Sequence, residues 1–342
     1  MELVSCTLRS IFSAVLFPPS IFVLIILIYI FYRKNRKISE KQNSIIGDSV
    51  ESAIGLTLSQ FVFGVFGGIV GSIILNMSGI VFDKNCRIEI LFLVSLIFMF
   101  IKPRFICFSY SAALLGAVGI ICEMISNILP GFEYSNVFKM DILSMMIFVG
   151  IMHIIEGILV FFDGHRGAVP IYIEKDGETL KGYSMRRYWP LPMSIIIMGG
   201  IMNYNGAYSS IGLEHIPYYW NMIKSQDKIE IIKSAGLFIS FFYAITGYST
   251  KTYTMTKKEK AHSSGIHIFS YGIILIIISQ IARIGIAGEI IVVIFAPAAH
   301  EFMLNIQRKR EQRRYLEFVN DEKESVKKFK DVLENESRKI KR

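Results

Sequence analysis

Long apolar runs recur along the chain and constrain its fold more than any other feature. Most are close to the length of about 20 residues that an α-helix needs to cross a bilayer. Hydrocarbon offers the backbone no hydrogen-bond partner, so runs of this length are typical of membrane helices. The sequence therefore predicts an all-α polytopic membrane protein with about nine transmembrane helices, within a range of about 8 to 10. The runs lie at residues 11–32, 53–75, 88–101, 105–129, 142–162, 191–212, 235–248, 266–282 and 284–304.

The basic residues lie mainly beside these runs and predict an orientation. The formal net charge is +9. Basic residues next to membrane spans contact anionic lipid, so we expect membrane lipid and not nucleic acid as their partner. If the N-terminus is outside, the cytoplasmic loops hold 16 Lys and Arg and the outside segments hold 8. Because basic residues accumulate in cytoplasmic loops, we expect a multi-pass cell-membrane protein with its N-terminus outside and its C-terminus in the cytoplasm.

Two segments outside the spans predict structure of their own. Residues 168–185 contain a β-rich run, a Lys-Asp-Gly turn and a second short run. This pattern predicts a small cytoplasmic β-hairpin at about 166–187, inserted in a transmembrane domain at 1–305. Residues 306–342 are dense in both charge signs and contain neither Gly nor Pro. They predict a charged cytoplasmic helical tail.

The tail combines a basic cluster with a narrow apolar seam, whose residues follow one another at seven-residue intervals. Such a seam docks a partner helix, whereas the basic residues alone suit a lipid surface, and both alternatives stay open. The residues expected to contact lipid or a protein partner are Arg308, Lys309, Arg310, Arg313, Arg314, Val319, Val326 and Leu333.

Two histidine–glutamate pairs lie within or beside apolar spans. His153 and Glu156 are about one helical turn apart, so they share a face of the fifth span. His300 and Glu301 lie near the cytoplasmic end of the last span. In the predicted topology both pairs occupy the cytoplasmic half of the membrane, which makes them a candidate site for a divalent ion such as zinc. The favoured alternative is a polar joint that fixes the fifth span against the last.

No recognised catalytic motif accompanies these pairs. Zinc proteases place His-Glu-x-x-His on one helix, but the position three after Glu301 is Leu304. No serine carries a recognisable nucleophile signature. Cys107 has no CxxC partner and is interpreted as a small packing group. We therefore expect a non-enzymatic protein with no cofactor beyond the candidate divalent ion.

The second span carries a stripe of glycines. Gly64, Gly67, Gly68 and Gly71 form overlapping small-xxx-small patterns. Such patterns let another helix approach closely. The stripe therefore predicts close packing inside the bundle, with homo-oligomerisation as the alternative.

Three stretches resemble the membrane region of MinJ-type proteins, the polytopic cell-division topology factors of Gram-positive bacteria. They are IKPRFICFSYSAALL at 101–115, HIIEGILVFFDGHRGAVPIYIEKDGETLKGYSMRRYWPLP at 153–192, and HEFMLNIQRKRE at 300–311. The resemblance extends from about residue 53 to residue 311.

The resemblance implies an integral membrane scaffold at division sites and poles, which links the coiled-coil protein DivIVA to the MinCD inhibitor. Members of this family carry a cytoplasmic PDZ domain after the last span. Here 28 residues follow Arg314, and they do not resemble that domain. We therefore expect a septal or polar scaffold that recruits cytoplasmic partners without a PDZ domain of its own.

Two other classes of function stay open. The first is a metal-binding intramembrane protein or enzyme that uses the two histidine–glutamate pairs. The second is a transporter or channel, with a path lined by Glu123, Asn203, Asn205 and Glu289.

Overall fold

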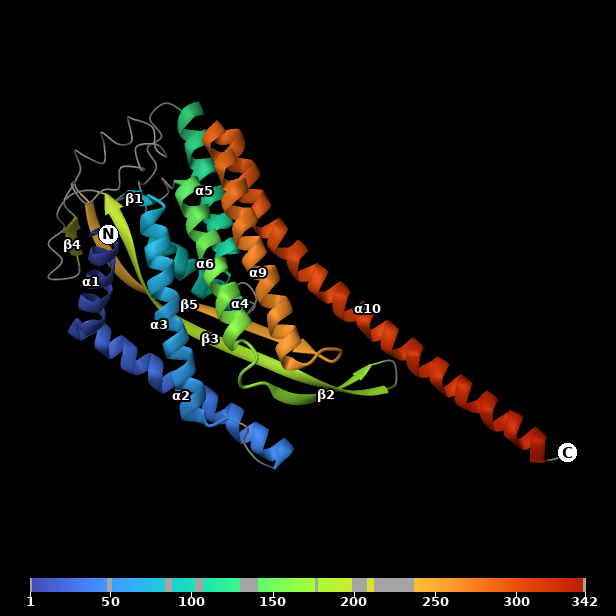
Figure 1. The fold of residues 1–342 in the computed structure, drawn as a ribbon. Helices are drawn as coiled ribbons and strands as arrows, with labels where there is room; N and C mark the ends of the chain where they lie inside the picture. The colour runs from blue at the N-terminus through green and yellow to red at the C-terminus, as the bar shows by residue number, and fades with distance from the viewer. Residues whose placement is uncertain are drawn as a thin grey trace.

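The computed structural model describes residues 2–47, 51–83, 88–101, 107–129, 141–175, 178–198, 208–211 and 237–340. These residues form a body of helices around a sheet, and the last helix projects far beyond this body (Figure 1). The helices are α1 (Glu2–Leu16), α2 (Pro18–Ile46), α3 (Ala53–Met77), α4 (Ile88–Ile101), α5 (Phe108–Ile128), α6 (Ile142–Asp163), α9 (Lys257–Ser279), the 3₁₀ helix η4 (Gln280–Ile284) and α10 (Ile286–Ile340).

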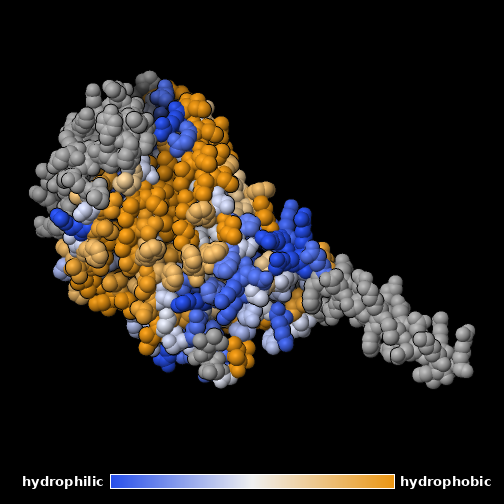
Figure 2. Space-filling model, viewed as in Figure 1, coloured by the Kyte–Doolittle hydropathy of each residue, from blue (hydrophilic) through white to orange (hydrophobic). Residues whose placement is uncertain are grey.

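Within the described part of the chain, five helical segments are long and apolar enough to cross a membrane, in place of the predicted total of about nine. They are Ala53–Met77, Phe108–Ile128, Ile142–Asp163, Lys257–Ile284 and Ile286–Glu317. Apolar side chains cover much of the body, and polar ones gather where α10 leaves it (Figure 2). The exposed apolar side chains include Phe22, Phe66, Ile121, Ile277 and Ile294. These are the features of a membrane protein.

The sixth and seventh predicted spans are wrong, because most of their described residues are β-strands. A five-stranded sheet has the order β1-β3-β5-β4, with β2 paired to β3. β3 and β5 pair antiparallel from Tyr183↔Thr252 to Met198↔Leu237. The strands are β1 (Val81–Asp83), β2 (Val169–Lys175), β3 (Glu178–Met198), β4 (Tyr208–Ile211) and β5 (Leu237–Thr252).

The composition of β3 and β5 explains why they are strands. Pro190 and Pro192 lack the amide hydrogens that a helix interior needs. Isoleucines and aromatic residues, which favour strands, fill much of the end of β3 and much of β5. Hydropathy alone cannot separate a buried strand from a buried helix, and this is why it predicts membrane spans for the two segments.

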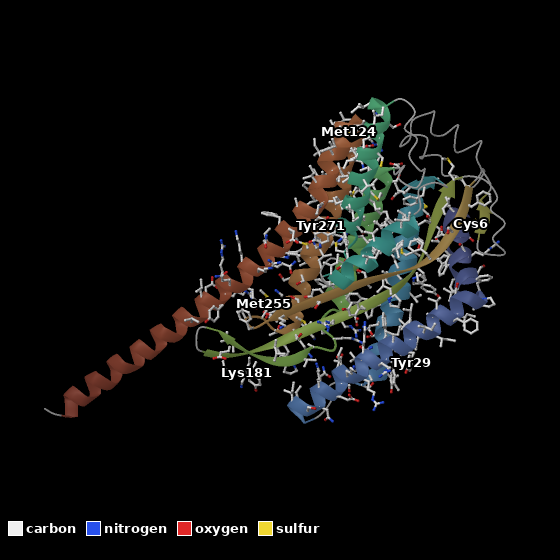
Figure 3. All side chains as sticks on the ribbon, turned by 180° about the vertical axis from the view of Figure 1, so that it is seen from behind. Cys6, Tyr29, Met124, Lys181, Met255 and Tyr271 are labelled. Carbon is white, nitrogen blue, oxygen red and sulfur yellow. The ribbon has the colours of Figure 1, made fainter. Side chains whose placement is uncertain are left out.

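The predicted hairpin is one arm of this larger sheet. β2 pairs antiparallel with the start of β3, from Val169↔Ser184 to Lys175↔Glu178. β3 then continues into the helical body, where it pairs with β5. Seen from behind, the sheet runs from Lys181 at the hairpin end toward Cys6 of α1 at the opposite end (Figure 3). One strand of the hairpin, β3, is therefore anchored in the helical body.

The first predicted span is split, because α1 ends at Leu16 and α2 begins at Pro18. The fourth and fifth predicted spans meet in the interior. Cys107, directly before α5, contacts His153 in the middle of α6. Gly116, farther along α5, lies against Ile142 at the start of α6. The α5 helix thus covers only the half of α6 that precedes His153.

The predicted glycine stripe packs inside the chain, with Gly64 and Gly68 against strand β3 and with Gly67 and Gly71 against both β3 and helix α6. A Cβ atom added at Gly64 or Gly68 would lie less than 3.0 Å from the carbonyl oxygen of Pro190 or Pro192, respectively. Only hydrogen atoms on these glycines let the backbone of β3 approach α3 so closely. The stripe therefore places β3 along the length of α3.

A buried ion pair joins α6, β3 and α3 at one end of the body. Asp163 accepts hydrogen bonds from Arg187 Nε at 3.0 Å and from Trp189 Nε1 at 2.8 Å. Arg187 also donates to the Leu56 carbonyl and the Ser59 hydroxyl. Burial lowers the pKa of the Arg187 guanidinium, and the neighbouring Asp163 carboxylate opposes that shift. The ion pair therefore fixes the end of α6 to the strand and to α3.

A second buried carboxylate fixes α10 to the turn between β5 and α9. Glu311 accepts hydrogen bonds from the Thr252 hydroxyl at 2.7 Å and from the Tyr253 amide at 2.9 Å. The Lys260 ammonium lies 3.2 Å from its other oxygen. These contacts hold the last helix beside β5.

We expect Gly68→Ala to lower the free energy of unfolding by about 1–3 kcal/mol, because the added methyl group would overlap the backbone of β3. Thermal unfolding in detergent, followed by tryptophan fluorescence, measures the change. Gly71→Ala is the matched control, since its methyl group would meet only side-chain atoms at 3.3 Å or more. Equal losses for the two variants would contradict the packing argument.

Asp163→Ala leaves the buried Arg187 without its carboxylate, and we expect it to cost about 3–5 kcal/mol of stability. The same unfolding measurement tests this expectation. Glu40→Ala removes an exposed ion pair with Arg36, and we expect a change of no more than about 0.5 kcal/mol from it. If Asp163→Ala proves as mild as this control, the ion pair does not hold the body together.

Candidate metal centre

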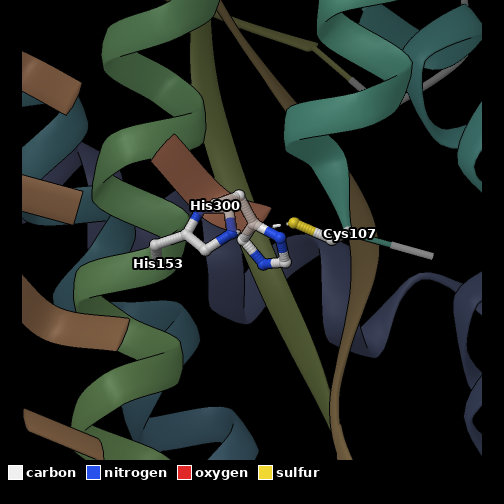
Figure 4. A group of neighbouring side chains, drawn as sticks. All are labelled: Cys107, His153 and His300. Carbon is white, nitrogen blue, oxygen red and sulfur yellow. Dashed lines mark hydrogen bonds between the residues drawn. The ribbon is translucent and has the colours of Figure 1, made fainter. Parts of the chain in front are cut away.

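Three side chains with metal-binding atoms converge in the interior. Cys107, His153 and His300 each offer one donor atom, and these atoms lie within 4.8 Å of one another. Figure 4 shows the thiol and the two imidazoles together, from the residue before α5, the middle of α6 and the first third of α10. His153 and His300 are buried, and Cys107 is partly buried. The two predicted histidines are thus brought together, with a cysteine as their third neighbour.

Hydrogen bonding fixes the tautomer of His153. Its Nδ1 atom lies 2.7 Å from the carbonyl oxygen of Val149, one turn earlier in α6. A carbonyl only accepts hydrogen bonds, so Nδ1 carries the hydrogen. In the neutral ring Nε2 then has a free lone pair, and this atom lies 3.0 Å from the Cys107 sulfur.

A relay of two side chains orients His300 in a similar way. The Tyr110 hydroxyl donates to a carboxylate oxygen of Glu301. That hydroxyl has a single hydrogen, so its contact of 3.1 Å with His300 Nδ1 is one in which the imidazole donates. This leaves the lone pair on Nε2 of His300. Metal-binding histidines commonly donate their other N–H group to such a partner.

Glu301 therefore contacts the candidate site indirectly and not as a ligand. The sequence places it among the metal ligands, whereas the structure links it to His300 through Tyr110. Consecutive residues of a helix point in different directions, so His300 and Glu301 do not face one point together.

Glu156, the other predicted carboxylate, lines a cavity beside the centre. This cavity measures about 440 Å³, and Cys107 and His300 also line it. Glu156 is one turn beyond His153 and forms a hydrogen bond with the Thr246 side chain of β5. The cavity extends along β3 and β5 as far as Arg186 and Gln307, near the end where polar residues gather. A small polar reactant therefore has space next to the three donor atoms.

A tyrosine and a serine complete the wall around the thiol. The Ser109 hydroxyl lies 2.8 Å from the Tyr271 hydroxyl, which in turn donates to the carbonyl of Ala296. Ser109 is also within hydrogen-bond reach of the Cys107 sulfur. These contacts come from α5, α9 and α10 and leave the thiol facing His153.

Cys107 is the main residue that the sequence interpretation missed. The sequence interprets it as a packing group, whereas in the structure its sulfur lies 3.0 Å from Nε2 of His153. One signal was present: Cys107 belongs to the KPRFICFSY segment, in which Ser109 and Tyr110 also serve the centre. Nothing in the sequence brings that segment to His153.

The residues of the other predicted sites lie apart from this centre. Arg308, Lys309, Arg310 and Arg313 are exposed on α10, and Arg314 is half-buried there. Val319 is half-buried, while the side chains of Val326 and Leu333 lie outside the described side chains, although α10 continues past them.

Of the predicted transport path, Asn203 and Asn205 lie outside the described residues. Glu123 is far along α5 from Cys107, and Glu289 is in the first turn of α10, well before His300. Neither glutamate lines the cavity beside the centre.

No family model, no curated protein and no solved structure matches the chain. The function of the centre must therefore follow from its own geometry.

Proposed function

We propose that this membrane protein binds a divalent ion of the zinc class and uses it for hydrolysis inside the membrane. The observation that carries the proposal is the convergence of Cys107, His153 and His300 from three helices at one end of a cavity. Thiolate and imidazole donors are those that zinc prefers. Both histidines turn a lone pair of Nε2 to the centre because their Nδ1 atoms are engaged elsewhere.

The number of ligands supports a catalytic centre over a structural one. Structural zinc sites are closed by four protein ligands, whereas catalytic sites have three and leave a position for water or substrate. In the described part of the chain, three donors meet, and the cavity adjoins them. Glu156 lines this cavity and is the residue we propose as the general base.

Hydrolysis at such a centre needs no further reactant. Cys107, His153 and His300 would hold the ion, which would supply a Lewis acid for a water molecule, and Glu156 would take one of the water protons. The water oxygen would bond to the carbonyl carbon of an amide or ester, and the bond to the leaving nitrogen or oxygen would break. Glu156 would then give the proton to the leaving atom, which yields an acid and an amine or alcohol.

We also propose that the polar end of the body faces the cytoplasm, with the N-terminus outside and the C-terminus inside. The hairpin of β2 and β3 and the exposed basic residues of α10 lie toward this end, and the N-terminus lies toward the other (Figures 1 and 2). Basic residues favour the cytoplasmic side. The cavity then extends from the centre toward the cytoplasm.

A scaffold at division sites is the second candidate function, and the length of α10 favours it. This helix has 55 residues, of which the last 23 lie beyond the apolar segment that ends at Glu317. A helix that extends so far from the body can present its surface to a cytoplasmic partner, as the MinJ-type resemblance implies for DivIVA and MinCD. A scaffold does not require the metal centre, so the two functions can be tested separately.

We expect protein purified in detergent to contain about one zinc ion per chain, measured by elemental mass spectrometry. Cys107→Ala, His153→Ala and His300→Ala should each retain less than about a tenth of this zinc content, because each removes a ligand.

Tyr110→Phe should weaken zinc affinity about 10–100-fold, because it removes the hydroxyl that links His300 to Glu301. Cys122→Ala and His267→Ala are the controls and should keep the full content. A metal-free protein whose Cys107 reacts readily with an alkylating agent would instead indicate a thiol–imidazole pair.

For the scaffold, we expect a fluorescent fusion to concentrate at septa or poles and to become uniform when the chain is trimmed after Glu317. This trimming keeps Glu311 and its contacts with the β5–α9 turn. His300→Ala in the full chain is the control, because it removes a metal ligand but no part of the tail. A signal that is uniform before and after trimming would exclude the scaffold function.

A further inference from the structure

The strand that lines the cavity has an unpaired edge. β4 pairs with β5 only from Leu237 to Ser240. From Phe241 to Thr252, β5 pairs with β3 on one side, and no described strand lies on its other side. Half of the backbone N–H and C=O groups in this stretch therefore point away from the sheet.

The cavity passes along this edge of β5 and also extends over the face of the sheet that carries Arg186 and Tyr188. Six consecutive residues of β5, from Ile245 to Thr250, line it. Successive side chains of a strand point to opposite faces, so a cavity against one face would meet alternate residues. β3 shows that alternation, because Arg186 and Tyr188 line the cavity and Arg187 does not. The unpaired edge of β5 therefore faces the cavity.

An unpaired edge that lines a cavity offers free backbone groups to an occupant. Backbone groups without partners are costly in hydrocarbon, and open sheet edges are tolerated only where protein covers them or where they line an aqueous cavity. An extended peptide satisfies such an edge by adding a strand. Ile268, Met303 and Leu304 line the same cavity, so the occupant that fits is mainly apolar.

The edge and the metal centre are close together. Thr246 of β5 is hydrogen-bonded to Glu156, one turn from His153. A strand added to β5 would run about 4.8 Å from it, within the same cavity that Cys107 and His300 line. A peptide bond of that strand would then lie in the cavity that two of the three donor residues line.

We propose that an extended, mainly apolar polypeptide segment binds as an additional strand on the Ile245–Thr250 edge of β5 and is the substrate of the centre. This rests on the proposed hydrolytic function and names its substrate class. A segment of a membrane protein fits this description once its helix is unwound, because a helix has no free backbone groups to offer the edge.

A pair of backbone-methylated peptides tests strand addition directly. The probe is a synthetic apolar peptide of about 14 residues with a central benzophenone group, supplied to the Glu156→Gln variant in lipid nanodiscs. One copy is N-methylated at odd positions and the other at even positions. A strand pairs through one edge, so only one of these copies should lose crosslinking.

We expect the unmodified peptide to crosslink within residues 245–250, and one methylated copy to crosslink at least about tenfold less. Equal crosslinking of both copies, or crosslinks elsewhere, would overturn the proposal. Zinc content measured on the same samples separates the two claims. If the protein contains zinc but both methylated peptides crosslink equally, the proposed substrate is rejected and the metal centre is retained. If one methylated peptide loses crosslinking but the protein contains no zinc, the metal centre is rejected and strand addition is retained.

Discussion

The buried ion pair of Asp163 and Arg187 is the interaction on which the arrangement of the body depends. It joins the end of α6 to β3, and through Leu56 and Ser59 it reaches α3. An uncompensated charge at this position would be strongly destabilising, so these three elements keep one relative position. Ten residues earlier on α6, about 15 Å along the helix axis, is His153. The ion pair thus also sets the depth of the proposed metal centre.

The sheet inside the helical body has one strand, β5, that is paired along one edge and lines the cavity with the other. The glycine stripe of α3 accommodates the backbone of β3, and β3 in turn satisfies one edge of β5. Along the cavity, no strand of the described residues pairs with the other edge of β5. The same strand therefore provides a wall for the centre and a surface that recognises backbone, which is why we connect the hydrolytic proposal with an extended substrate.

Parts of the fold and of the site could be predicted because they depend on local pattern. The pairing of β2 with β3, the close approach at Gly68 and the approach of His153 to His300 all follow from residue type and spacing. The strands of the sixth and seventh predicted spans could not be predicted, since an apolar run has the same hydropathy as helix or strand. Cys107 could not be assigned because its partner is 46 residues away in sequence.

The sequence by itself indicated a membrane protein, since several of its apolar runs are long enough to cross a bilayer as helices. It also placed His153 and His300 within apolar runs, whereas the buried Asp163, Arg187 and Glu311 lie outside the runs and only the structure shows their burial. Only the tertiary structure decided that Cys107, and not Glu156 or Glu301, joins the two histidines. The physical reason is that metal-binding geometry depends on where three helices approach one another, and this is set by the packing of α5, α6 and α10 around the sheet.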